Sequence, residues 1–231
     1  MSADSPAAQL PLQLRIDDSA SFGNFAPAPS LAPLCHALAA VDREPLYFLH
    51  GGAEAGKSHL LQAACRAAGG HALYLPLAPL AGADPAALLQ DLEGRARLAL
   101  DDLQCVAGDG RWEEALFHLV NRCRASRCQL LLAARQPPAA LAVCLPDLRS
   151  RLAGGITWAL PPHDDGDRAR ILRLRAQHRG LSLGAPVVDY LCRRASRSLG
   201  DLLAILERLD AASLQRQRAI TVPLVREVMG W

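Results

Sequence analysis

Lysine is almost absent from this sequence: Lys57 is the only one, and the other 24 basic residues are arginine. An excess of either charge is also missing, because 25 basic and 23 acidic residues give a net charge of only +2. A protein whose main activity is to bind nucleic-acid phosphates carries a clear excess of basic residues. We therefore do not expect phosphate-backbone binding to be its main activity. We expect the single lysine to stand where lysine chemistry is required.

Long apolar runs are missing as well, and none approaches the roughly 18 residues of a membrane span. The N-terminus, Met1 to Asp4, lacks the basic start and apolar stretch of a signal peptide. The seven cysteines form no C-x-x-C pair and are odd in number, which is typical of reduced thiols. These absences predict a cytoplasmic protein without a membrane segment.

The composition supports a sizeable core, since 51% of the residues are hydrophobic and 21% are charged. Disorder over most of the chain is thereby excluded. Strand-like and helix-like segments alternate as far as residue 160. The predicted strands are 46–50, 72–75, 98–100, 129–134 and 156–160, and the predicted helices are 58–68, 86–92, 112–125 and 146–152. This alternation predicts a three-layer α/β domain on a mostly parallel sheet.

The pattern changes after Pro161 and Pro162, where only helical periodicity remains. Helices are expected over 165–179, 186–197, 200–217 and 223–230. The first 30 residues are instead rich in Ala, Pro and Ser and predict a flexible lead-in. We expect three parts: an arm over 1–20, an α/β nucleotide-binding domain over 21–161, and a small all-helical lid over 162–231.

Residues 51–58 match the pattern G-x-x-x-x-G-K-[ST] at every fixed position, between a predicted strand and a predicted helix. In such a loop the backbone N–H groups surround phosphates. Lys57 would contact the β- and γ-phosphates, and Ser58 would bind Mg²⁺. The sequence thus predicts ADP or ATP with Mg²⁺. The expected nucleotide-binding residues are Gly51, Gly52, Ala53, Glu54, Ala55, Gly56, Lys57, Ser58 and His59.

Two carboxylates, Asp101 and Asp102, follow the apolar segment Leu98 to Leu100. A strand-end aspartate beside a phosphate loop can hold the metal through water, and a second acid can polarise an attacking water. We assign Asp101 to the metal and Asp102 to catalysis. The alternative is a solvated strand end with no function.

Several stretches together resemble the AAA+ family of the replication initiator DnaA, and within it the Hda type of regulator. They are residues 21–25, 51–64, 100–108, 112–117, 145–152 and 220–227. The resemblance covers residues 9–231, and the Trp112-Glu113 helix and the N-terminal arm favour the Hda type. It implies an AAA+ P-loop domain followed by a helical lid. DnaA continues past its lid into a DNA-binding domain, whereas this sequence ends at Trp231, so we expect no sequence-specific DNA reading.

The resemblance also implies a function. Hda-type proteins are negative regulators of replication initiation that stimulate ATP hydrolysis by DnaA while bound to the DNA-loaded sliding clamp. Arg151 matches the family's arginine finger, a residue that acts in trans on the nucleotide of a neighbouring molecule. Arg149 is a second candidate.

Residues 9–14, Gln-Leu-Pro-Leu-Gln-Leu, resemble the peptide with which Hda-like proteins bind the DNA polymerase III sliding clamp, the beta subunit. A strand-like peptide of this kind places spaced leucines in an apolar groove. The expected clamp-binding residues are Gln9, Leu10, Leu12 and Leu14. The alternative is that this stretch pairs as an edge strand.

Two positions depart from the family's pattern. Ala133, Ala134 and Arg135 stand where the Thr/Ser-x-Asp of a polar first sensor is expected, and Gly200 stands where the second-sensor arginine is expected. Both changes remove groups that read a γ-phosphate, so we expect weak or no intrinsic ATPase activity and a bound nucleotide, ADP by resemblance. Two other functions stay open: an autonomous ATPase of the helicase-loader type, and a non-catalytic adaptor between DnaA and the clamp. Assembly into a homo-oligomer stays open too.

Overall fold

The computed structural model describes residues 20–40 and 46–231. In this part of the chain five strands form one sheet in the order β2-β3-β4-β1-β5. The strands are β1 (Leu46–His50), β2 (Ala72–Pro76), β3 (Arg97–Asp101), β4 (Gln129–Ala134) and β5 (Ile156–Ala159). All neighbouring strands are parallel. The predicted α/β fold on a parallel sheet is thus confirmed.

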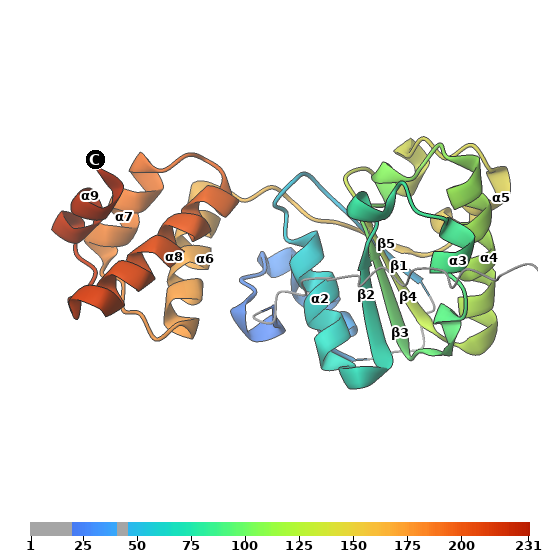
Figure 1. Cartoon of the computed structure of the whole chain (residues 1–231), viewed down its shortest axis with the longest axis horizontal. Coiled ribbons are helices and arrows are strands. Elements are labelled where there is room, and N and C mark those ends of the chain that lie inside the picture. The colour runs from blue at the N-terminus through green and yellow to red at the C-terminus, as the bar shows by residue number, and fades with distance from the viewer. Residues whose placement is uncertain (1–19, 41–45) are drawn as a thin grey trace, which may run out of the picture.

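Helices cover both faces of the sheet (Figure 1). One face packs against α1 (Ala32–Ala39) and α2 (Lys57–Ala67), and the other against α3 (Pro85–Leu88), α4 (Gly110–Ser126) and α5 (Pro146–Ala153). Strand β1 shows how the chain serves both layers. Leu46 and Phe48 enter the core on the α4 side, while Tyr47 and Leu49 enter the core on the α2 side. The continuous apolar run of this strand follows from its burial on both faces.

The C-terminal region is a separate helical layer with its own core (Figure 1). It consists of α6 (Asp165–His178), α7 (Ala185–Arg194), α8 (Leu199–Arg216) and α9 (Val222–Met229). Fully buried side chains such as Leu172, Leu191, Leu209 and Leu224 hold these helices together. No helix among the described residues is both long and apolar enough to cross a bilayer.

Three local predictions were wrong. Helix α1 was not foreseen, because Pro27 and Pro29 just before it suggested turns; Pro33 lies in the first turn of the helix, where a missing N–H costs nothing. The helix predicted over 86–92 ends at Leu88, and Asp91 adopts a left-handed conformation at φ 57°. Helix α7 ends at Arg194 rather than near residue 197, because the backbone turns extended at Ala195.

A buried arginine ties the first helical layer to the sheet. Arg97 is 0% exposed, and its guanidinium donates hydrogen bonds to Gln129 Oε1 at 2.7 Å, to the Leu38 carbonyl at 2.9 Å and to the Ala40 carbonyl at 2.6 Å. These acceptors come from α1, from the residue after it, and from β4. Their alignment depends on one side chain.

We expect Arg97→Leu to lower the free energy of unfolding by about 3 kcal/mol or more, because each orphaned buried acceptor costs roughly 1–3 kcal/mol. Urea unfolding followed by circular dichroism would measure the loss. Arg95→Leu, at an exposed position two residues earlier, is the matched control and should have little effect. Equal stability of the two variants would contradict this role of Arg97.

Candidate functional site

The glycine-rich segment predicted to bind phosphate connects β1 to α2 at the carboxyl end of the parallel strands. Ligands of open α/β sheets bind at this edge. Gly56 is the N-cap of α2 and has φ 90°, a conformation that favours glycine. A Cβ at this position would also lie 2.7 Å from the ring of Phe25. Glycine is therefore required here both by conformation and by space.

Lys57 is the first residue of α2, at the end of this loop, and is buried. Its Nζ donates hydrogen bonds to the carbonyls of Gly51 at 2.8 Å and Gly52 at 2.7 Å. Burial lowers the pKa of Lys57 below its ordinary value, and the charges of Asp101 and Asp102 act against this. The ammonium group thus lies inside the loop, where anionic oxygens could replace the two carbonyls as its partners.

The two residues predicted to hold the metal, Ser58 and Asp101, meet at one hydroxyl group. Asp101 ends β3, is 1% exposed, and accepts hydrogen bonds from the Tyr74 hydroxyl at 2.9 Å and the Asp102 N–H at 2.8 Å. The Tyr74 hydroxyl also hydrogen-bonds to Ser58. Burial, followed by the charge of Asp101, raises the pKa of Tyr74 above its ordinary value, so Tyr74 stays protonated. Hydroxyl and carboxylate oxygens are the ligands that Mg²⁺ prefers, so the residues present fit this ion.

Asp102 turns away from the strand in a left-handed conformation at φ 57°. Its Oδ1 accepts a hydrogen bond from Gln104 Nε2 at 2.8 Å, and Gln104 Oε1 accepts one from the Arg135 N–H at 3.1 Å. Arg135 follows β4, the strand between β1 and β3, and its positive charge contributes to the lowered pKa of Lys57. The residues at the predicted first-sensor position therefore do more than remove polar groups, because Arg135 adds a second positive charge near Lys57.

His59 joins three segments at the start of α2. Its Nδ1 accepts a hydrogen bond from the Arg175 guanidinium at 2.9 Å, and its ring stacks on Phe25 with centroids 5.3 Å apart. An arginine only donates, so the proton of this histidine lies on Nε2, which donates to the Ser21 carbonyl at 2.8 Å. His59 therefore connects α2 to the N-terminal segment and to helix α6 of the lid.

Glu54 is a loop residue that faces the lid. Its carboxylate accepts hydrogen bonds from the Ser198 hydroxyl at 2.7 Å and from the N–H groups of Leu199 at 3.0 Å and Gly200 at 2.9 Å. The bond from Ser198, helped by those from Gly200 and Leu199, lowers the pKa of Glu54 below its ordinary value. From the sequence motif, Glu54 was predicted only to line the phosphate-binding loop, and its contact with the lid was not predicted.

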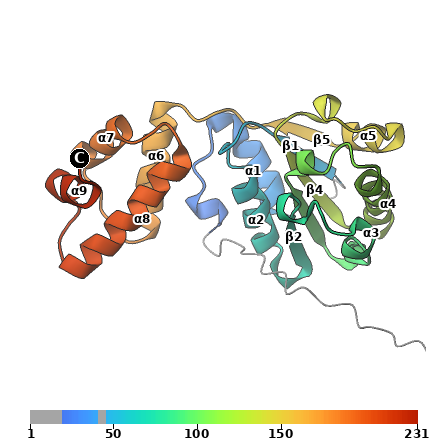
Figure 2. The ribbon, with the colours of Figure 1, turned by 45° about the horizontal axis from the view of Figure 1, so that its top comes forward.

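Arg151 lies far from this cluster. It is exposed on α5 and lines a groove of about 160 Å³ with Leu46 and Leu130, which lie near the amino ends of β1 and β4. The phosphate loop is at the carboxyl ends of the strands, and Figure 2 shows α5 and the lid at opposite ends of the molecule. Within the described residues the Arg151 side chain makes no hydrogen bond or ion pair, whereas the Arg149 side chain donates to the Val143 carbonyl. The structure therefore separates Arg151 from the residues of its own chain that are predicted to bind nucleotide.

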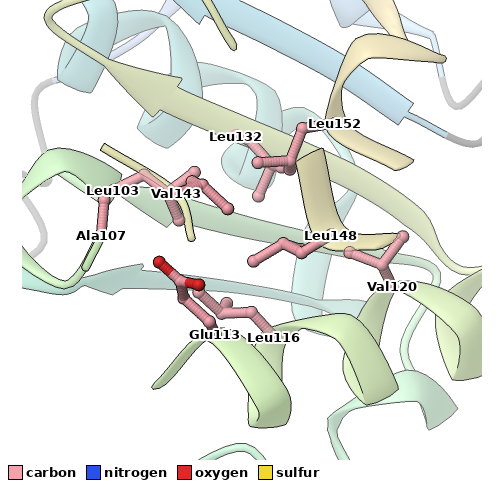
Figure 3. A pocket seen from close by; sticks show the side chains of 9 residues that line it. All are labelled: Leu103, Ala107, Glu113, Leu116, Val120, Leu132, Val143, Leu148 and Leu152. Atoms are coloured by element: carbon pink, nitrogen blue, oxygen red, sulfur yellow. The ribbon is translucent and has the colours of Figure 1, made fainter. Parts of the chain in front are cut away.

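A buried glutamate fixes the start of α5. The Glu113 carboxylate accepts hydrogen bonds from the N–H groups of Gly108 at 2.8 Å, Cys144 at 2.9 Å and Leu145 at 2.7 Å. Burial alone would raise the pKa of Glu113, but these donors outweigh it and the pKa lies below its ordinary value. Figure 3 shows Glu113 beside an apolar cavity of about 10 Å³, which is too small for a ligand. Glu113 therefore holds in place the helix that carries Arg149 and Arg151.

The predicted clamp-binding residues Gln9, Leu10, Leu12 and Leu14 lie outside the described residues. Among the described residues, no group of three or more His, Cys, Asp or Glu side chains could hold a metal ion by itself. A cation at Ser58 and Asp101 would therefore depend on oxygens from a bound ligand and from water.

Comparison with known proteins finds one family match in the lid and several solved structures with a similar fold. Residues 165–229 match the family described as the Hda lid domain. Domain III of DnaA from Thermotoga maritima is 21% identical and superposes with a TM-score of 0.77, covering 93% of this chain and 97% of that one. DnaA from Aquifex aeolicus bound to AMPPCP is 23% identical with a TM-score of 0.68, covering 88% of this chain and 70% of that one.

A branch migration motor shares the fold as well. The RuvB Holliday junction branch migration motor of Thermotoga maritima is 18% identical with a TM-score of 0.67, covering 91% of this chain and 71% of that one. At these identities the solved structures establish the fold, and the family match is confined to the lid. The chain therefore has the fold of DnaA domain III, and its residues 165–229 are similar to the Hda lid domain.

Proposed function

We propose that this protein is a negative regulator of replication initiation that supplies Arg151 in trans to ATP bound by DnaA. The observation that carries the proposal is the position of Arg151. It is exposed, has no partner within the described residues, and lies at the opposite end of the sheet from the phosphate loop. A guanidinium in that position serves a neighbouring molecule rather than its own nucleotide.

The chemistry of such a finger is electrostatic. During phosphoryl transfer, negative charge spreads over the equatorial oxygens of the γ-phosphate, and a guanidinium fork can contact two of them. Glu113 fixes the loop before α5 through its bonds to Cys144 and Leu145, so the finger is held on a rigid element. Preorganised charge of this kind needs no rearrangement when the reaction occurs.

The phosphate loop of the chain itself would bind adenine nucleotide. The support is the glycine-rich turn, the buried ammonium of Lys57, and the convergence of Ser58 and Asp101 on Tyr74. Mg²⁺ held near these oxygens would neutralise phosphate charge when bound. Gly200 brings no cation from the lid, so we propose that ADP is the nucleotide retained and that intrinsic hydrolysis is weak, despite the carboxylate of Asp102 nearby.

The N-terminal arm would bring the protein to the DNA-loaded sliding clamp. We expect that deleting residues 1–15, or changing Leu12 and Leu14 to alanine, abolishes clamp binding. A terminal peptide motif of this kind should add little to the folded core, so the melting temperature should be almost unchanged. Surface plasmon resonance on immobilised clamp would measure the affinity. Unchanged binding by either variant would contradict the assignment of Gln9, Leu10, Leu12 and Leu14.

The whole proposal is tested by following ATP hydrolysis on DnaA with and without this protein. Stimulation is expected when both the protein and DNA-loaded clamp are present, and little should occur when either is omitted. If DnaA activity is suppressed without any hydrolysis, the adaptor function replaces the proposed one.

A further inference from the structure

The lid contacts the α/β unit through two separate sets of hydrogen bonds. The first set comes from α6. Arg175 donates to His59, and His178 Nε2 lies 2.8 Å from the Gly23 carbonyl. Arg170 donates to the Pro27 carbonyl at 2.9 Å. The second is the contact between Glu54 and the first turn of α8. The two sets of contacts involve different parts of the α/β unit. The first set reaches the N-terminal segment and α2, and the second reaches the glycine-rich loop itself.

The second contact places a charge at the end of a helix. Ser198 is the N-cap of α8, and Leu199 and Gly200 are its first two residues. Their N–H groups have no partner within an α-helix, and the helix end carries partial positive charge. Glu54 accepts hydrogen bonds from both N–H groups and from the Ser198 hydroxyl. A carboxylate from another segment, 144 or more residues away, thus completes the cap of α8.

Both sides of this contact show a specific local adaptation. Glu54 has φ 63°, a left-handed conformation that a non-glycine residue adopts only at an energetic cost. Gly200 has no side chain where one would collide, because a Cβ there would lie 2.9 Å from Glu54 Oε1. The left-handed backbone at Glu54 and the absence of a side chain at Gly200 together allow the carboxylate to reach the end of the helix.

We propose that Glu54 is a positioning residue that fastens the lid to the phosphate loop and so couples lid docking to nucleotide binding. The proposal rests on the proposed nucleotide site. Glu54 lies between Gly51 and Gly56, so a loop held by the lid is already ordered for phosphate. The N–H groups at the start of α8 also bind the Glu54 carboxylate, whose negative charge would otherwise repel phosphates.

This coupling is reciprocal. Whatever factor the fastened lid adds to nucleotide affinity, bound nucleotide adds to lid docking. Such factors range from roughly 5- to 150-fold. For hydrogen bonds at the surface we expect a change of about tenfold, near the lower end of this range.

The test uses the full chain and a fluorescent ADP analogue whose release is followed by stopped flow. Glu54→Gln removes the charge, and Gly200→Ala places a methyl group against the carboxylate. Each should speed release about tenfold, and the double variant should be no faster than either single one, since both break the same contact. Gly184→Ala is the matched lid control, because its Cβ meets only an ordinary contact at 3.7 Å.

Glu54→Gly separates this role from a merely structural one. Glycine relieves the left-handed strain, which offsets part of the stability lost with the carboxylate, yet without the carboxylate release should still be faster. Slower or unchanged release from Glu54→Gly, or additive effects in the double variant, would overturn the proposal.

Amide hydrogen exchange of the nucleotide-free chain keeps this proposal distinct from the proposed function. The N–H groups of Leu199 and Gly200 should be protected in the wild type and lose protection in Glu54→Gln. If no nucleotide binds while this protection is seen, the nucleotide site fails but the contact stands. If the protection is the same in both proteins, the contact itself is absent.

Discussion

Replacing Arg151 with alanine should reduce the stimulated rate of ATP hydrolysis by DnaA by roughly 10³-fold or more, which is the contribution of an arginine supplied in trans. The guanidinium stabilises charge that exists mainly in the transition state of a reaction in the partner's site. Because Arg151 is exposed and unpartnered among the described residues, folding, nucleotide retention and clamp binding should be unaffected. A single-turnover hydrolysis assay with DnaA and loaded clamp measures the loss.

Two further variants sharpen this result. Arg151→Lys should rescue poorly, because an ammonium group cannot form the same fork across two oxygens. Arg149→Ala removes a hydrogen bond to the Val143 carbonyl, so it should lower the melting temperature slightly and slow hydrolysis much less. If Arg149 proves essential and Arg151 dispensable, the finger has been assigned to the wrong residue.

Lys57→Ala should abolish the retention of nucleotide by this protein, lowering its affinity by roughly 100-fold or more. Truncating one partner of a buried charged contact costs about 2–5 kcal/mol. The lost group is a buried ammonium whose present partners are the carbonyls of Gly51 and Gly52. Chromatography of the nucleotide released on denaturation measures the content.

Arg66→Ala is the control for Lys57→Ala, because Arg66 is an exposed cation in the last turn of the same helix. It should retain the wild-type amount of nucleotide. Equal nucleotide content in wild type and Lys57→Ala would remove the proposed site.

Local sequence signals were sufficient for much of the fold. The apolar run Leu46 to His50, bounded by Pro45 and Gly51, predicted a buried strand at the position where β1 lies. The helix after Lys57 and the helical character beyond residue 165 follow from periodicity and capping in the same way. Helix α1 was missed because proline marks helix starts as well as turns.

The contacts that the sequence could not predict are long-range ones. The pairing of Tyr74 with Asp101 joins two strands, and that of Glu113 with Leu145 joins two helical segments. Glu54 is the clearest case, since the motif predicts that it faces phosphate, whereas its carboxylate caps a helix of the lid. No local pattern marks such residues, because their partners are chosen by the tertiary fold.

The central claim is that the nucleotide hydrolysed is the partner's and not the one held by this chain. The most direct measurement loads ATP labelled at the γ-phosphate onto either DnaA or this protein, then mixes both with DNA-loaded clamp and follows release of labelled phosphate. Our account predicts rapid release when the label starts on DnaA and almost none when it starts on this protein. Rapid release from label carried by this protein would contradict the account and identify an autonomous ATPase.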